Sequence, residues 1–124
     1  MKKHILLLSC VFLLINGCID PLNPKRNVLI RVNNVSPYDF EDLLVNTSGG
    51  ENEYGNLGSD LISVYKSYDF AYQYAYVSLT IDGKEFVLQP IDYVGETKIP
   101  NGKYTYEINV DTATEDIDLN FIED

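Results

Sequence analysis

The sequence predicts an all-β domain: an antiparallel two-sheet sandwich of Greek-key type, immunoglobulin-like or transthyretin-like, with about seven strands. From Val28 onward, apolar residues recur with a period of two, which is typical of half-buried strands. Turn-forming residues interrupt this pattern every eight to twelve residues or so, and no segment has convincing helical periodicity. A small barrel is the alternative fold.

The expected strands follow from this alternation. In 28–34, Val28, Ile30 and Val32 share one face, as a half-buried strand requires. Asp82-Gly83 is the residue pair preferred in a two-residue type I′ turn, so it predicts a hairpin. The two strands of this hairpin are 72–81 and 84–89. The other expected strands are 40–46, 61–66, 102–110 and 117–122.

Residues 1–17 have the composition of a lipoprotein signal peptide. Lys2 and Lys3 give a basic start, residues 5–15 are almost entirely apolar, and Gly17 stands before Cys18. The apolar stretch is shorter than the roughly 20 residues of helix that span a bilayer. The alternative is an ordinary cleaved signal followed by a chance cysteine.

The segment Ile15-Asn16-Gly17-Cys18 resembles a bacterial lipobox. The resemblance implies diacylation of the Cys18 thiol, cleavage after Gly17 and acylation of the new amino terminus. Several acyl chains on one residue hold a protein firmly, whereas one chain holds it only marginally. We therefore expect residues 18–27, which contain two prolines, to tether a domain of residues 28–124 to a membrane.

Removal of residues 1–17 changes the composition in a way that limits the chemistry. Lys2 and Lys3 are lost while all 19 acidic residues remain, so the formal net charge falls from −10 to −12, which disfavours nucleic acid as a partner. His4 and Cys10 are also lost, leaving no histidine and no cysteine except the lipidated Cys18. We therefore expect no cofactor, no histidine- or cysteine-based metal site and no enzyme activity of the usual nucleophilic kinds.

Several segments resemble those of small, uncharacterised Bacteroidetes-type β-sandwich lipoproteins. The resemblance implies a lipid-anchored sandwich at the outer membrane or cell surface, and it implies no activity and no site residues. The segments that carry it are 33–40 (Asn-Asn-Val-Ser-Pro-Tyr-Asp-Phe), 71–76 (Ala-Tyr-Gln-Tyr-Ala-Tyr), 81–84 (Ile-Asp-Gly-Lys), 89–96 (Gln-Pro-Ile-Asp-Tyr-Val-Gly-Glu) and 102–106 (Gly-Lys-Tyr-Thr-Tyr).

Tyrosine is the most distinctive feature of the composition, with ten in the chain. In the expected strand 72–81, Tyr72, Tyr74 and Tyr76 alternate and would project from one face at a spacing of roughly 7 Å. Sugar rings and peptide side chains stack well on such a row, which makes these three residues a candidate ligand-binding site. The alternative is that the rings pack against the edge of the domain or a covering loop.

The acidic stretch 111–118 holds four carboxylates in a turn. Oxygen-rich loops bind calcium, but this one lacks the glycine and the distal glutamate of a calcium-binding helix-loop-helix loop, which favours a solvated turn. Asp111-Thr112-Ala113 also resembles the O-glycosylation signal of exported Bacteroidetes proteins, so Thr112 is a candidate glycan site.

Ser63 and Lys66 match the S-x-x-K motif of penicillin-recognising enzymes. That chemistry needs both side chains on one helical face, and in a strand positions three apart point to opposite faces. We discard it.

These observations together favour a non-enzymatic binding module for a protein, peptide or glycan, held at the membrane by its lipid. The alternative is a structural or accessory subunit of an outer-membrane or surface assembly, docked through an edge strand. A carboxylate-based hydrolase is a third alternative, and it would need two carboxylates facing each other in a concave pocket.

Overall fold

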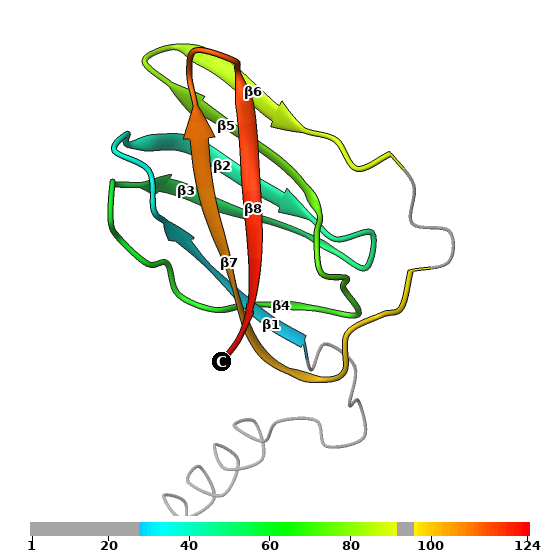
Figure 1. The fold of residues 1–124 in the computed structure, drawn as a ribbon. Coiled ribbons are helices and arrows are strands. Elements are labelled where there is room, and N and C mark those ends of the chain that lie inside the picture. Colours follow the sequence, from blue (N-terminus) through cyan, green and yellow to red (C-terminus); the bar gives the residue numbers. More distant parts are fainter. Residues whose placement is uncertain (1–27, 92–95) are drawn as a thin grey trace, which may run out of the picture.

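The computed structural model describes residues 28–91 and 96–124, which form two four-stranded sheets packed face to face (Figure 1). The sheet orders are β4-β1-β7-β8 and β3-β2-β5-β6. This confirms the all-β sandwich. The expected signal peptide, Cys18 and the tether lie outside the described residues. The strands are β1 (Val28–Asn34), β2 (Phe40–Asn46), β3 (Glu51–Leu57), β4 (Lys66–Tyr68), β5 (Tyr76–Ile81), β6 (Lys84–Leu88), β7 (Gly102–Asp111) and β8 (Asp116–Glu123).

The expectation of entirely antiparallel sheets was wrong, because β1 and β7 run parallel along the whole of β1. Val28 pairs with Gly102 at one end, and Asn34 pairs with Ile108 at the other. The period-two pattern shows which side chains face the core, but it carries no information about the direction of a distant partner. The second sheet is antiparallel throughout.

The structure has one strand more than expected. Residues 51–57, which were not expected to form a strand, form β3. Gly55 pairs with Leu43, and the register shifts on both sides of this pair. Gly55 and Asp42, which precedes Leu43, have positive φ values of 69° and 52°. Because of these shifts, neither strand shows clean alternation along its length.

The strand expected at 61–66 does not form. Instead, residues 60–63 lie along the edge of β1, where the Asn34 amide donates to the Leu61 carbonyl (3.0 Å) and the Ser63 amide donates to the Val32 carbonyl (2.8 Å). The Ser63 hydroxyl accepts from the Val32 amide at 2.9 Å and donates to the Val64 carbonyl at 2.8 Å, so it is committed to structural bonds. Regular pairing with β1 begins only in β4.

The hairpin prediction is confirmed. Ile81 pairs with Lys84, and Asp82 and Gly83 between them have φ values of 49° and 80°, as both central residues of a type I′ turn require. The first of its strands is shorter than expected, however, because β5 begins at Tyr76 rather than at residue 72.

The core lies between the sheets and includes three tyrosines in addition to aliphatic residues. Tyr68, Tyr104 and Tyr106 are each at most 2% exposed. The Tyr104 hydroxyl donates to the Pro100 carbonyl at 2.6 Å, and the Tyr106 hydroxyl donates to the Tyr72 carbonyl at 2.7 Å. Buried hydroxyls must find such partners, so these rings fix the loops on which their acceptors lie. In the described ranges, no helix is long and apolar enough to cross a membrane.

Candidate binding face

The face of the β3-β2-β5-β6 sheet that points away from the core carries polar side chains in cross-strand rows. Val45, Val77 and Leu79 point inward and are at most 1% exposed, so their strand neighbours point outward. The strand register places Asn46 opposite both Glu51 and Tyr76. In the next row, Leu44 stands opposite both Glu53 and Ser78.

This face is hollowed over both rows. A hollow of about 470 Å³ lies on the first row, and a hollow of about 400 Å³ lies on the second. Leu44 and Ser78 line both hollows, which are therefore neighbours on this face. The first is lined by Leu44, Asn46, Ser48, Glu51, Tyr76, Ser78, Gln89 and Pro90, and the second by Asp42, Leu43, Leu44, Glu53, Gly55, Ser78, Leu79, Thr80 and Glu85.

A third hollow of about 400 Å³ borders the first, and Gln89 and Pro90 line both. Its other lining residues, Tyr74, Leu88 and Ile91, are apolar or aromatic. We call the three together the outer groove. Its lining thus changes along its length, from apolar near Tyr74 to hydrogen-bonding at the first row and acidic at the second.

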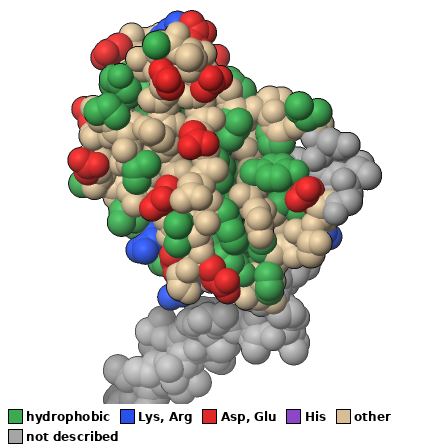
Figure 2. All heavy atoms as spheres, in the orientation of Figure 1, with side chains coloured by type: hydrophobic (Ala, Val, Ile, Leu, Met, Phe, Trp, Pro, Cys, Tyr) green, Lys and Arg blue, Asp and Glu red, His purple; other side chains and the backbone are tan. Residues whose placement is uncertain are grey.

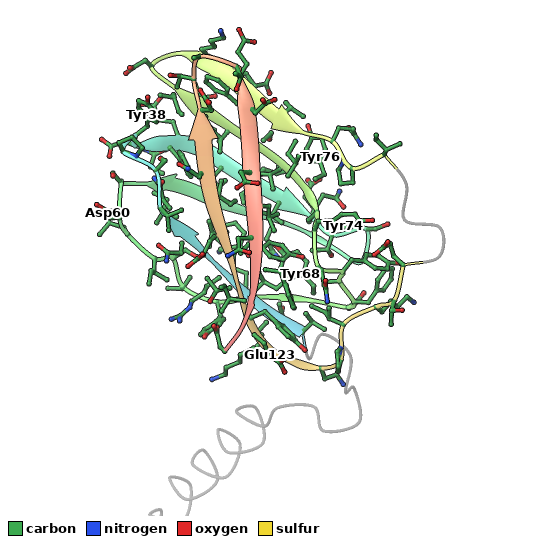
Figure 3. The ribbon with its side chains drawn as sticks, viewed as in Figure 1. Tyr38, Asp60, Tyr68, Tyr74, Tyr76 and Glu123 are labelled. Carbon is green, nitrogen blue, oxygen red and sulfur yellow. The ribbon has the colours of Figure 1, made fainter. Side chains whose placement is uncertain are left out.

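The three tyrosines of the expected row do not share one strand face, because β5 begins only at Tyr76. Tyr76 lines the first hollow and Tyr74 the third, and Figure 3 shows both near the start of β5. Tyr72 instead packs edge-to-face on Phe70, with ring centroids 6.0 Å apart and an interplanar angle of 84°. Two of the three therefore lie at the outer groove, in neighbouring hollows.

Sequence reasoning missed the polar partners of these tyrosines. These partners lie at three strand ends and in one turn: Asn46 ends β2, Glu51 begins β3, Gln89 follows β6, and Ser48 lies in the turn between β2 and β3. They line the same hollow as Tyr76 only because of the sheet register. The Asn46 side-chain amide donates to Glu51 Oε1 at 3.1 Å. No sequence signal marked them, since β3 was not recognised as a strand.

Positive charge lies away from the outer groove. In the described part of the chain, no lysine or arginine lines any of its three hollows. Each lysine or arginine in the described ranges instead lies over an aromatic ring, 4.1 to 5.8 Å from its centroid. Figure 2, which shows the face formed by β7 and β8, has basic side chains at its margin and carboxylates scattered across it. The cation–ring pairs are Arg31 and Lys103 on Tyr65, Lys66 on Tyr54, Lys84 on Phe86 and Lys98 on Phe70.

The acidic turn between β7 and β8 is exposed. Its first residue, Asp111, forms hydrogen bonds to the backbone of the turn. Asp111 Oδ1 accepts from the Ala113 amide at 2.9 Å and from the Thr114 amide at 3.3 Å. Thr112 is exposed, and its hydroxyl lies 3.2 Å from the Tyr38 hydroxyl. In the part of the chain that the structure describes, no three acidic, histidine or cysteine side chains are grouped to hold a metal ion.

A cluster of opposite charges lies on the outer face of the other sheet, around Asp124. Its carboxylate accepts from the Tyr65 hydroxyl (2.6 Å) and the Thr105 hydroxyl (2.8 Å), with Arg31 Nε at 3.6 Å. Desolvation alone would raise the pKa of Asp124, but these hydrogen bonds, with the charges of Arg31 and Lys103, outweigh it and lower the pKa. The hydrogen bond to Asp124 is also the main cause of the raised pKa of Tyr65.

Comparison with known proteins supports the fold alone. Neither protein-family models nor curated proteins gave a match to this chain. Among solved structures, it is similar to the NMR structure of a protein from Eubacterium rectale, with a TM-score of 0.53 and 20% sequence identity. The match covers 86% of this chain and 94% of the other. At this identity the likeness shows a shared sandwich fold and nothing about activity.

Proposed function

We propose that this protein is a non-enzymatic binding module of the cell envelope and that its ligand, a protein, peptide or glycan segment, lies in the outer groove. The single observation that carries the proposal is that three neighbouring hollows lie over one sheet face, with Tyr76 and two amide side chains, Asn46 and Gln89, lining the first. An aromatic ring offers stacking area, and amides donate and accept hydrogen bonds, which is the combination that recognition surfaces use.

Binding rather than catalysis is favoured by the residues available. The outer groove offers carboxylates, amides and hydroxyls, and after cleavage at Cys18 the chain would contain no histidine and no free thiol. A surface of this composition forms many weak polar contacts without an activated nucleophile.

The binding test compares variants of the detergent-solubilised, full-length lipidated protein on glycan and peptide arrays. Tyr76→Ala combined with Asn46→Ala should abolish retention of any ligand that the native protein retains. Tyr65→Ala is the matched control, since Tyr65 is also half-buried but lies away from the outer groove. Equal retention by the native protein and the double variant, with both still folded, would refute the proposed site.

The membrane attachment proposed from Cys18 needs its own test. Cys18→Ser should move the protein from the membrane fraction to the soluble fraction, because the thiol to be acylated is lost. Metabolic labelling with an alkyne fatty acid should mark the native chain and not the variant. A labelled Cys18→Ser protein would contradict lipidation at this residue.

A second function, as an accessory subunit of an outer-membrane or surface assembly, is favoured by β8. It is an edge strand, and its eight residues pair with β7 without a bulge, so its other edge offers a regular backbone for strand addition. A fixed partner should then copurify in constant ratio after detergent extraction. Recovery of monomer alone, measured by light scattering, would count against this function.

A further inference from the structure

We propose that the outer groove takes an extended, positively charged peptide segment of a partner protein, with an apolar residue at the end that reaches Tyr74. This inference rests on the proposed function, because it assigns a ligand class to the same site.

The first argument is charge complementarity. Among the residues that the structure describes, the outer groove is lined by four carboxylates, from Glu51, Glu53, Glu85 and Asp42, and by no basic side chain. Lys84, the described lysine nearest to Glu85 along the chain, binds Glu115 at 2.7 Å instead. An uncompensated negative groove on a protein of net charge −10 attracts cations and repels anionic glycans and nucleic acid.

The second argument is the spacing of these carboxylates. They come from three different strands, and the described residues hold no group of acidic side chains close enough to bind one metal ion. Adjacent rows on a sheet face are roughly 7 Å apart, which is also the distance between alternate side chains of an extended peptide. The pattern therefore matches successive lysines or arginines of a chain better than a single ion.

The third argument separates a peptide from a polyamine or an amino sugar. The outer groove has an apolar end, formed by Tyr74, Leu88, Pro90 and Ile91, and Leu44 lies between its two polar hollows. Leu44 is only half-buried, and Ile91 is 97% exposed. A ligand that covers both parts needs ammonium groups and an apolar side chain on one backbone, which a peptide provides.

The test uses a fluorescein-labelled peptide, Leu-Leu-Ser-Lys-Ser-Lys-Ser-Lys, and the full-length lipidated protein in neutral detergent, read by fluorescence anisotropy. A second peptide carries glutamine in place of each lysine. We expect the lysine peptide to bind, the glutamine peptide to bind at least about tenfold more weakly, and added salt to weaken binding of the lysine peptide.

The deciding variant is the triple change Glu51→Gln, Glu53→Gln and Glu85→Gln. It keeps side-chain size and leaves an oxygen to accept from Asn46, so the fold should persist. The matched control removes three exposed carboxylates outside the outer groove: Asp60→Asn, Asp118→Asn and Glu123→Gln. The groove variant should lose at least about tenfold in affinity, and the control should lose much less.

Each contrary result has a distinct meaning. Equal loss in both triple variants would show general attraction of a cation to an acidic protein and would overturn the inference. Equal binding of the two peptides, or binding of a neutral oligosaccharide alone, would also overturn it; if that binding were abolished by Tyr76→Ala, the proposed function would stand. Failure of every peptide and glycan to bind would overturn both.

Discussion

The hydroxyl of Tyr54 lies 2.9 Å from the hydroxyl of Tyr68 and 2.8 Å from the carbonyl oxygen of Ile30. Tyr54 is in β3 of one sheet, and Ile30 and Tyr68 are in β1 and β4 of the other. Because Tyr54 has one proton, which it donates to the carbonyl, Tyr68 donates to Tyr54. Desolvation by burial raises the pKa of both phenols, so both stay protonated at neutral pH and tie the two sheets together.

Tyr54→Phe should destabilise the domain by about 1–3 kcal/mol, since the Ile30 carbonyl and the Tyr68 hydroxyl would each lose a partner in the interior. Tyr68→Phe should cost less, because Tyr54 would keep its bond to Ile30. Urea denaturation followed by circular dichroism measures both. A larger loss for Tyr68→Phe would contradict this assignment of donor and acceptor.

Asn34→Asp should be more destabilising than Asn34→Ala at neutral pH. Asn34 is fully buried, and its side-chain amide donates to the carbonyls of Tyr38 (2.8 Å) and Leu57 (3.0 Å). A carboxylate there would face both carbonyl oxygens without a proton, at a cost of about 3–5 kcal/mol. That cost should shrink as pH falls and the new carboxyl protonates, whereas the Asn34→Ala cost should not depend on pH. Parallel pH dependence of the two variants would argue against this reading.

Gly49→Ala should destabilise the turn between β2 and β3. A Cβ at this position would approach the Phe70 carbonyl oxygen to within 2.2 Å and the Phe70 ring to within 2.6 Å, so backbone would have to move. We expect a loss of about 1–3 kcal/mol, measured by thermal denaturation. Because Ser48 in the same turn lines the outer groove, ligand binding should weaken as well. Unchanged stability would show that the loop carrying Phe70 adapts freely.

Asp124→Asn should lower the melting temperature at pH 7 by only a few °C, because partly exposed ion pairs contribute little. The pKa of Asp124 is lowered in the folded protein, so its contribution is present above the unfolded value, near 3.8, and is lost as pH falls through the folded pKa. Native protein and variant should therefore converge once the pH lies below the lowered pKa of Asp124. A difference that grows on acidification would contradict the direction of this shift.

The alternation of residues in β1 was enough to predict which of its side chains form the core. Val28, Ile30 and Val32 are each at most 1% exposed, as the period of two requires. The hairpin at Asp82-Gly83 was equally predictable, since the positive φ of both residues restricts the turn to a few residue types. These features are local, so the sequence determines them by itself.

Tertiary structure decided the rest. The parallel pairing of β1 with β7 joins segments that are distant in sequence, and no local pattern encodes direction. β3 was hidden because Tyr54 and Leu57 are its only large apolar residues and Gly55 between them takes a positive φ of 69°. The outer groove depends on register, because Asn46 stands beside Glu51 and Tyr76 only when three strands are aligned. A single sequence specifies the faces of its strands, whereas a site built across strands exists only once the packing of the whole sandwich fixes their order and offset.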